Sequence, residues 1–339
     1  MFRFFRPFLH CLDPERAHGL TLSALQMAQS AHLLASPPVS NPILGQKIWG
    51  LSFAAPLGMA AGFDKDGKVP HALFSLGFGF VEIGSVTPLA QFGNPKPRVF
   101  RVEKEGAIIN ALGFPSEGAE RVKARLGGKY KGVLGVNLGA NKDSKNFVED
   151  YVAGAKIFAG LADFLVVNIS SPNTEGLRDL QGEEALRGLI RGVKKHSKKT
   201  PLLVKLSPDM ERQEGQKLAH VILEEEADGI IISNTTIARG GKGGLSGKPL
   251  FAPSTKLLRD VAAVTRGFIP LIGFFSLASA EDAYEKIRSG ASLVELYTAL
   301  VYQGPQLIGQ IHEGLCALLT KDGFANISEA VGVDVKEQR

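Results

Sequence analysis

Eight short stretches of this 339-residue chain are almost continuously apolar, and they recur along most of its length with amphipathic segments between them. They cover residues 56–62, 80–86, 132–139, 164–170, 201–207, 229–235, 269–275 and 293–298. Apolarity without alternation is typical of parallel strands that are buried on both faces. Helical periodicity lies between them, for instance at 183–198, 210–225, 253–266, 279–289 and 305–319. Eight such strand–helix units predict an α/β fold, a (β/α)8 TIM barrel.

Residues 1–40 fall outside this repeat and predict a two-helix extension, which leaves residues 41–339 for the barrel. Asp13 followed by Pro14 has the pattern of a helix N-cap and first helical position. The two helices carry more apolar side chains than they can bury by themselves. They therefore either pack on the barrel or enter a membrane surface, with Arg3 and Arg6 near anionic head groups.

Two further segments interrupt the repeat between strands. Residues 97–110 predict a β-hairpin that turns at residues 104–106. The glycine-rich segment at 238–249 follows the sixth predicted strand, and its composition is also that of a flexible surface loop.

Composition restricts the class of protein. Hydrophobic residues make up 44 % of the chain and charged residues 22 %, as in ordinary folded proteins. The net charge of +5 is dispersed and has no aromatic-interleaved basic run, so a nucleic-acid partner is not expected. Cys11 and Cys316 stand alone, which argues against a disulfide framework or zinc site and fits a reducing compartment. No secretory signal or membrane span is expected.

Amides, hydroxyls and a lysine follow six consecutive predicted strands. They are Asp64 and Lys65, then Ser85 and Thr87, then Asn137, residues 168–174, Lys205 and Ser207, and residues 233–236. Each alone is a common turn residue. Because the loops at the carboxyl ends of barrel strands meet at one rim, the set together predicts a flat, hydrogen-bonding ligand.

The residue types in this set also limit the chemistry. Acidic pairs are sparse and no histidine occurs in the set, which argues against a glycosidase and a metal hydrolase, so no metal is expected. A lysine near the end of an apolar strand, such as Lys205, is also compatible with a Schiff-base enzyme.

Several motifs, in order along nearly the whole chain, resemble one family. They are MAAGFDKDG (59–67), EIGSVTP (82–88), GNPKPRVFR (93–101), NISSPNT (168–174), VKLSPD (204–209), SNTT (233–236), GGLSGKPL (243–250) and ELYTALVYQGP (295–305). The chain resembles dihydroorotate dehydrogenase. Ser171, where the soluble class has cysteine, and the segment RPFLHCLDPERAH resemble the membrane-associated, quinone-reducing class 2.

This resemblance implies oxidation of dihydroorotate to orotate with FMN as cofactor and a membrane quinone as electron acceptor, in pyrimidine (UMP) synthesis. Ser171 matches the catalytic base. The matches to substrate-binding positions are Lys65, Asn110, Phe114, Asn168, Asn173, Asn234 and Thr235. The matches to cofactor-binding positions are Ala60, Ala61, Gly62, Ser85, Asn137, Asn168, Lys205, Ser233, Gly247, Tyr297 and Thr298.

The resemblance also implies where the protein acts. The N-terminal helices are expected to form the mouth of a quinone tunnel and to contact the membrane peripherally. The absence of an evident transit peptide favours the cytoplasmic side of a cell inner membrane, and a monomer is favoured. Residues 176–181, which follow NISSPNT, are expected to form a lid that excludes water.

Two stretches depart from the family pattern. Phe275 and Ser276, in LIGFFSLAS, stand where glycines are expected near the cofactor phosphate, which predicts weaker FMN binding. Ala111 and Pro115 alter the substrate loop NALGFPSEG. The alternative function is therefore a barrel that has lost its flavin and serves as a binding or structural protein.

Overall fold

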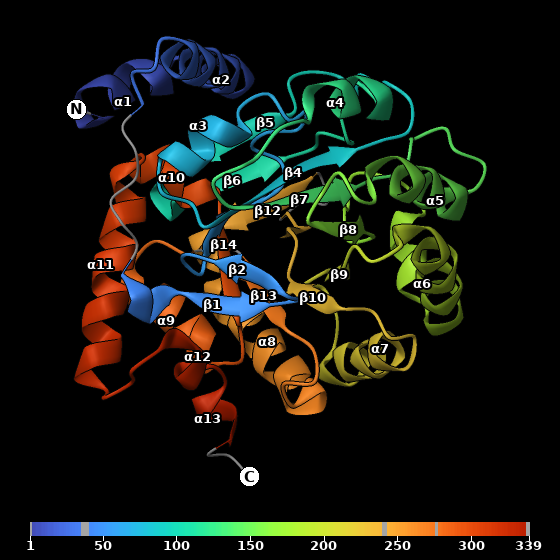
Figure 1. Cartoon of the computed structure of the whole chain (residues 1–339). Coiled ribbons are helices and arrows are strands. Elements are labelled where there is room, and N and C mark those ends of the chain that lie inside the picture. Colours follow the sequence, from blue (N-terminus) through green and yellow to red (C-terminus); the bar gives the residue numbers. More distant parts are fainter. Residues whose placement is uncertain (1, 35–40, 239–242, 275–276, 337–339) are drawn as a thin grey trace.

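The computed structural model describes residues 2–34, 41–238, 243–274 and 277–336, and it confirms the (β/α)8 barrel (Figure 1). Eight parallel strands close in the order β3, β4, β7, β8, β9, β10, β13, β14, so each strand pairs with the next one along the chain. Their bounds are β3 Leu57–Met59, β4 Phe80–Val86, β7 Val133–Leu138, β8 Phe164–Asn168, β9 Leu202–Leu206, β10 Gly229–Ile232, β13 Leu271–Phe274 and β14 Leu293–Leu296. Every residue of these strands is buried, as expected for strands covered on both faces.

Helices cover the outside of the barrel. They are α3 Pro70–Ser75, α4 Ala119–Arg125, α5 Phe147–Phe158, α6 Glu183–Ser197, α7 Arg212–Glu224, α8 Phe251–Thr265, α9 Ala280–Arg288, α10 Thr298–Gln303 and α11 Gln306–Lys321. All five helices predicted by residue range are confirmed to within two residues at each end. Their apolar faces and the strands form one core, to which the short helices α12 Ile327–Ala330 and α13 Val333–Lys336 add near the C-terminus.

A second apolar cluster fills the barrel interior, from the amino-terminal ends of the strands up to Ala60 and Phe274 at the predicted site. Phe80 and Phe164 are fully buried there, and their ring centroids are 6.3 Å apart. A hairpin of β1 Gln46–Ile48 and β2 Leu51–Phe53, which the sequence did not predict, adds Phe53 and Trp49 to this cluster. The amino-terminal end of the barrel is thus a packed core.

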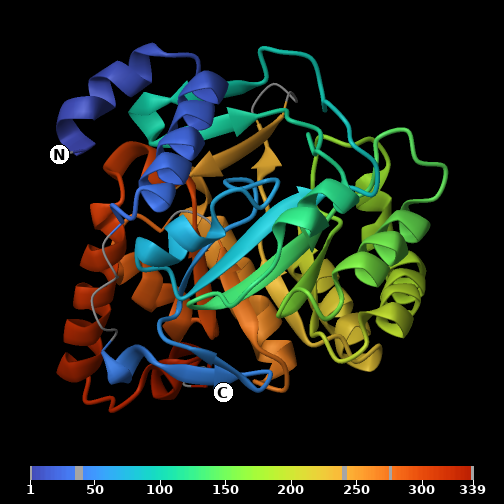
Figure 2. The same cartoon turned by 45° about the horizontal axis from the view of Figure 1, so that its top comes forward.

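Helices α1 Phe2–Cys11 and α2 Pro14–Ser30 lie beside the other end of the barrel, next to the hairpin that residues 97–110 form (Figure 2). The Asp13 side chain accepts a hydrogen bond from the Arg16 N–H, which confirms the predicted cap. The Glu15 carboxylate in α2 accepts two hydrogen bonds from Arg98, of 2.7 and 3.1 Å. Among the described residues, no helix is long and apolar enough to cross a membrane.

The predicted hairpin is confirmed as β5 Val99–Val102 and β6 Ala107–Asn110, with the turn between them. It belongs to a four-stranded antiparallel sheet in the order β11, β12, β6, β5, where β11 is Thr236–Ile237 and β12 is Gly244–Gly247. The glycine-rich segment is therefore not only a loop, because residues 244–247 pair with β6; residues 239–242 lie outside the described part. At Gly247, which has φ of 103°, a Cβ would lie 2.4 Å from the Gly106 carbonyl oxygen.

The second half of the barrel contains a fully buried lysine. The Lys286 ammonium in α9 donates to Ser254 Oγ at 2.8 Å and Thr255 Oγ1 at 3.2 Å, and no carboxylate of the described residues lies within 4.0 Å of it. Burial lowers the pKa of Lys286 to about 7.

This lysine predicts how stability varies with pH. The pKa of Lys286 is lowered in the folded state, so its contribution to the free energy of unfolding is present at high pH and is lost as the pH falls toward about 7. In urea denaturation between pH 7 and 10, we expect Lys286→Met to be more stable than the wild type at pH 7 and to show a flatter pH dependence. Parallel pH profiles of the two proteins would contradict this assignment.

Candidate active site

A cavity of about 800 Å³ lies at the carboxyl ends of the barrel strands and continues between them and helices α1 and α2. Most residues predicted for the site line it. They are Ala61, Gly62, Lys65, Ser85, Asn110, Phe114, Asn168, Ser171, Asn173, Lys205, Asn234, Thr235, Tyr297 and Thr298. The structure therefore brings together residues that lie far apart in the sequence.

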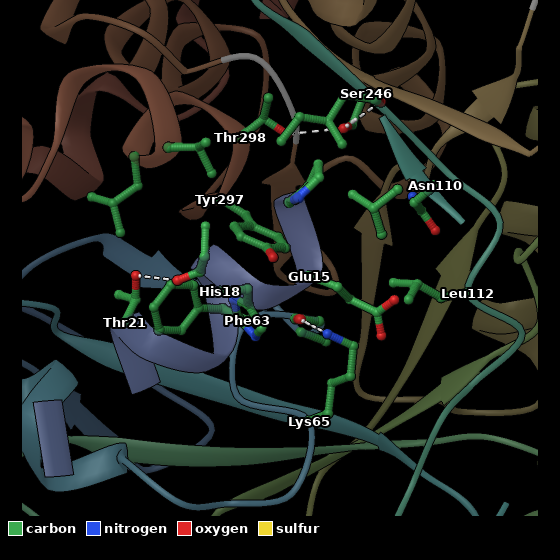
Figure 3. A pocket seen from close by; sticks show the side chains of 18 of the residues that line it. Glu15, His18, Thr21, Phe63, Lys65, Asn110, Leu112, Ser246, Tyr297 and Thr298 are labelled. Atoms are coloured by element: carbon green, nitrogen blue, oxygen red, sulfur yellow. Dashed lines mark hydrogen bonds between the residues drawn. The ribbon is translucent and has the colours of Figure 1, made fainter. Parts of the chain in front are cut away.

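The cavity has a polar half and an apolar half. The polar half is formed by the strand ends and by the four-stranded sheet above them. Phe8, Leu9, Leu20, Ala24, Leu25 and Ala28, from the two N-terminal helices, line the other half. Figure 3 shows His18, Phe63 and Tyr297 grouped near Lys65 and Glu15, where the two halves meet.

An ion pair inside the barrel forms the base of the polar half. Lys205 Nζ is 3.1 Å from Glu82 Oε2 and 3.8 Å from Glu295 Oε2, and all three side chains are buried. Burial, together with the charge of Glu82, raises the pKa of Glu295 well above its usual value. The raised pKa favours the protonated form of Glu295, so the closest ionic contact of Lys205 is with Glu82.

Sequence reasoning missed both glutamates. They stand within motifs that carried the resemblance, but a lone acidic residue in an apolar strand gives no sign that a lysine from another strand lies beside it. The ion pair also disfavours the Schiff-base alternative, because a Schiff-base lysine must present a free amine to its substrate and Lys205 Nζ is held by Glu82 at 3.1 Å.

A chain of amide and hydroxyl groups runs from this ion pair along the rim. Asn137 Nδ2 donates to Glu82 at 2.6 Å, and the Ser85 hydroxyl donates to Asn137 Oδ1. Asn168 Nδ2 donates to Ser85 Oγ at 3.0 Å and to Asn137 Oδ1 at 3.1 Å. Asn168 Oδ1 in turn accepts hydrogen bonds from Asn234 at 3.2 Å and from the Ser170 hydroxyl at 2.9 Å. These bonds fix the orientation of each amide.

Ser171 stands at the end of β8, where this chain of groups meets the substrate loop. Its side chain is buried and lines the cavity. Its Oγ accepts a hydrogen bond of 3.2 Å from the Asn173 N–H. The Asn173 amide donates to Asn110 Oδ1, also at 3.2 Å. Ser171 therefore has a fixed backbone donor on one side and the cavity on the other.

Lys65 lies on the opposite wall, in the loop after β3. Its ammonium donates to the Gly62 carbonyl at 2.6 Å. Burial lowers the pKa of Lys65 to about 8, so the group is still mostly protonated at pH 7. Burial, with the charge of Lys65, lowers the pKa of His18 to about 3, so the imidazole is neutral.

Arg178 is a third residue that sequence reasoning did not single out. It lies in the 3-10 helix Leu177–Gln181, the segment expected to act as a lid. Its guanidinium donates to the Ser170 carbonyl at 3.0 Å, to the Thr235 carbonyl at 3.2 Å and to Asp209 at 2.8 Å. It thus ties the segment to the loops that carry Ser171 and Thr235.

Four predicted residues lie behind the cavity wall or beside it. Ala60 and Asn137 are fully buried, and the Ser233 hydroxyl is buried without a hydrogen-bond partner among the described residues. Gly247 adjoins Thr298, whose hydroxyl bonds Ser246 at 2.9 Å. Phe275 and Ser276 lie outside the described residues. Within the described part, no cluster of three potential metal ligands occurs.

An eight-stranded parallel barrel with a polar site at the carboxyl ends of its strands is the architecture of a (β/α)8 enzyme. A family model described as Dihydroorotate dehydrogenase matches residues 43–319. The chain belongs to the dihydroorotate dehydrogenase family, as its motifs predicted.

Curated relatives and a solved structure agree with the family model. Dihydroorotate dehydrogenase (quinone) from Parvibaculum lavamentivorans is 50 % identical over 347 residues, which cover 99 % of each chain. The mitochondrial dihydroorotate dehydrogenase (quinone) of Arabidopsis thaliana is 46 % identical over 97 % of this chain and 80 % of its own. The crystal structure of DHODH from Eimeria tenella in complex with ferulenol has a TM-score of 0.90 at 38 % identity and covers 95 % of this chain and 96 % of its own.

Proposed function

We propose that this chain oxidises dihydroorotate to orotate with FMN and passes the electrons to a membrane quinone, the redox step of pyrimidine synthesis. The observation that carries this proposal is that the larger cavity at the strand ends has two unlike halves. Its polar half offers amides, Ser171 and Lys65 to a small planar acid, and its apolar half suits a hydrophobic electron acceptor. A redox reaction with two such partners needs a site that both can reach.

The residues fit a flavin, the cofactor of this family. The Ser233 hydroxyl is buried and unpartnered among the described residues, which leaves a donor for a ligand. Ser85 in β4, Lys205 in β9, and Tyr297 and Thr298 after β14 line the cavity at the same end of the barrel. We assign FMN to this wall, with Lys205 beside its ring system and Thr298 with Gly247 toward its phosphate. FMN bound there supplies the acceptor for the hydride from C6 of the substrate.

The side chains of this chain perform the proton chemistry and the positioning. Ser171 Oγ accepts the proton from C5 of dihydroorotate as its own hydroxyl proton passes on to solvent, and Arg178 ties the adjacent segment to the loop that carries Ser171. The Asn173 N–H holds the oxygen of Ser171 in place. Asn110, Asn168, Asn173, Asn234 and Thr235 hold the pyrimidine ring, Phe114 covers it, and the Lys65 ammonium neutralises its carboxylate.

We assign the quinone to the apolar half and the membrane contact to residues 1–40, with residues 41–339 as the FMN-binding domain. Phe8, Leu20, Met27 and Leu33 of this extension are exposed, by 63 %, 52 %, 72 % and 77 %. Such a surface suits a peripheral protein on the cytoplasmic side of a cell inner membrane. A monomer is sufficient for this function, because one chain supplies both halves of the cavity.

The proposal is tested by the absorption spectrum of the purified protein before and after anaerobic addition of dihydroorotate. We expect flavin bands that bleach with substrate and return when a quinone is added. Acid extraction and chromatography of the released flavin identify it as FMN. A protein that stays colourless after incubation with FMN would overturn the proposal in favour of a flavin-less binding protein.

A further inference from the structure

A second cavity, of about 430 Å³, lies between α2, the loop around Ala90 and the start of α4. Glu15, His18, Lys65 and Pro115 line both this cavity and the larger one, so the two cavities share a wall. Ala90 and Arg121 are exposed at its outer end, whereas Lys65 is at its inner end. The second cavity therefore reaches from the surface to the wall of the proposed substrate site.

Charged residues line this cavity, and its carboxylates already have partners. Glu15 pairs with Arg98 at 2.7 Å. Lys68 Nζ lies 2.6 Å from Glu117 and 3.9 Å from Asp66. The remaining one, Asp64, accepts hydrogen bonds from the backbone N–H groups of residues 68 and 69, at 2.8 and 2.7 Å. These pairings leave little net negative charge to repel an anion.

Two cations of the cavity have no such partner. Neither Lys65 nor Arg121 forms an ion pair with any carboxylate of the described residues. They stand at opposite ends of the cavity, with Arg121 at the surface and Lys65 beside the proposed substrate site. An anion that enters meets one unpaired cation outside and another inside, which is how a charged cleft raises the local concentration of a substrate.

The larger cavity is less suitable as an entry for an anion. Its outer part is lined by apolar side chains of α1 and α2, where a carboxylate would lose its hydration without gaining a partner. A quinone, in contrast, suits that lining. The charged substrate thus has an opening lined by charged residues, and the apolar quinone has an opening lined by apolar residues.

We propose that the second cavity is the entry for the anionic substrate, a small planar carboxylate that passes from Arg121 to Lys65 without crossing the quinone-binding half. This inference rests on the proposed function, since it assumes that the substrate binds beside Lys65. In this proposal Arg121 captures the substrate at the surface. The ion pair of Glu15 and Arg98 forms part of the wall that separates the substrate route from the quinone route.

Rapid mixing of the FMN-loaded protein with dihydroorotate, without oxygen, tests this entry. Arg121→Glu is expected to lower the second-order rate constant of flavin bleaching about 3- to 10-fold at low ionic strength, and about 0.5 M salt should largely abolish the difference. Lys123→Glu is the matched control, with the same charge change on the same helix; its side chain is exposed and does not line the cavity, so it should resemble the wild type. Ala90→Trp narrows the opening and should slow bleaching at any salt concentration.

Quinone-driven reoxidation should be equal in all four proteins, because the apolar route is unchanged. Equal bleaching rates in Arg121→Glu, Ala90→Trp and the wild type would overturn the entry while leaving the proposed function intact. So would an equal loss in Lys123→Glu. A wild type that binds FMN but is not bleached by dihydroorotate would instead overturn the proposed function.

Discussion

Replacing Ser171 with alanine is expected to lower the turnover number with dihydroorotate about 10²- to 10⁴-fold, the usual contribution of a positioned general base. Ser171 Oγ reaches the cavity, and among the described residues its one hydrogen-bond partner is the N–H of Asn173, which cannot act as a base in its place. The variant should remain folded and yellow. Steady-state quinone reduction and anaerobic bleaching measure the loss.

Ser171→Cys is the matched variant for this prediction. A thiol has an ordinary pKa of about 8.5, so its turnover should recover in part and should increase as the pH rises toward that value. Ser52→Ala, at an exposed position of β2, controls for the loss of a hydroxyl elsewhere. Normal turnover in Ser171→Ala would show that Ser171 is not the catalytic base.

Lys205→Met should produce the largest loss of stability. The substitution leaves Glu82 without its charged partner in the barrel, where both side chains are buried. Breaking a buried ion pair from one side typically costs about 3–5 kcal/mol. Urea denaturation of the variant and wild type measures this difference, and the variant should also retain less flavin.

A second substitution separates charge from packing. In Lys205→Met with Glu82→Gln, the buried negative charge is absent, so the double variant should recover much of the stability while flavin binding stays weak. In the wild type, Asn137 donates a hydrogen bond to Glu82 at 2.6 Å. The amide oxygen of the introduced glutamine can accept the same hydrogen bond. If Lys205→Met alone were as stable as the wild type, the ion pair would not contribute to the fold.

The barrel could be predicted from the sequence because its strands are apolar on both faces, a pattern that few other folds require. The predicted strand at residues 229–235 ends earlier, at Ile232, because the polar residues that follow turn into the site. The β1–β2 hairpin escaped prediction because each of its strands has only three residues. Its burial depends on Phe80 and Phe164, which are distant in sequence.

The site was predictable to the extent that its residues stand at strand ends. Asn168 and Asn234 follow different strands, yet the barrel brings their amides to 3.2 Å. Glu82 and Arg178 were missed for a common reason: their partners come from other strands and loops, and only the closed barrel brings them together. The second cavity likewise depends on how α2 packs, which local sequence does not encode.

Helix α1 is attached to the barrel through main-chain atoms near its C-terminal end. Arg101, in β5, donates hydrogen bonds to the main-chain carbonyls of Leu9, His10 and Leu12, at 2.9 to 3.2 Å. Every residue type has a carbonyl, so this attachment does not depend on which side chains the helix carries. In the proposed membrane contact, the side chains of α1 can therefore diverge to suit lipids of different composition, while the end of the helix stays fixed to the barrel.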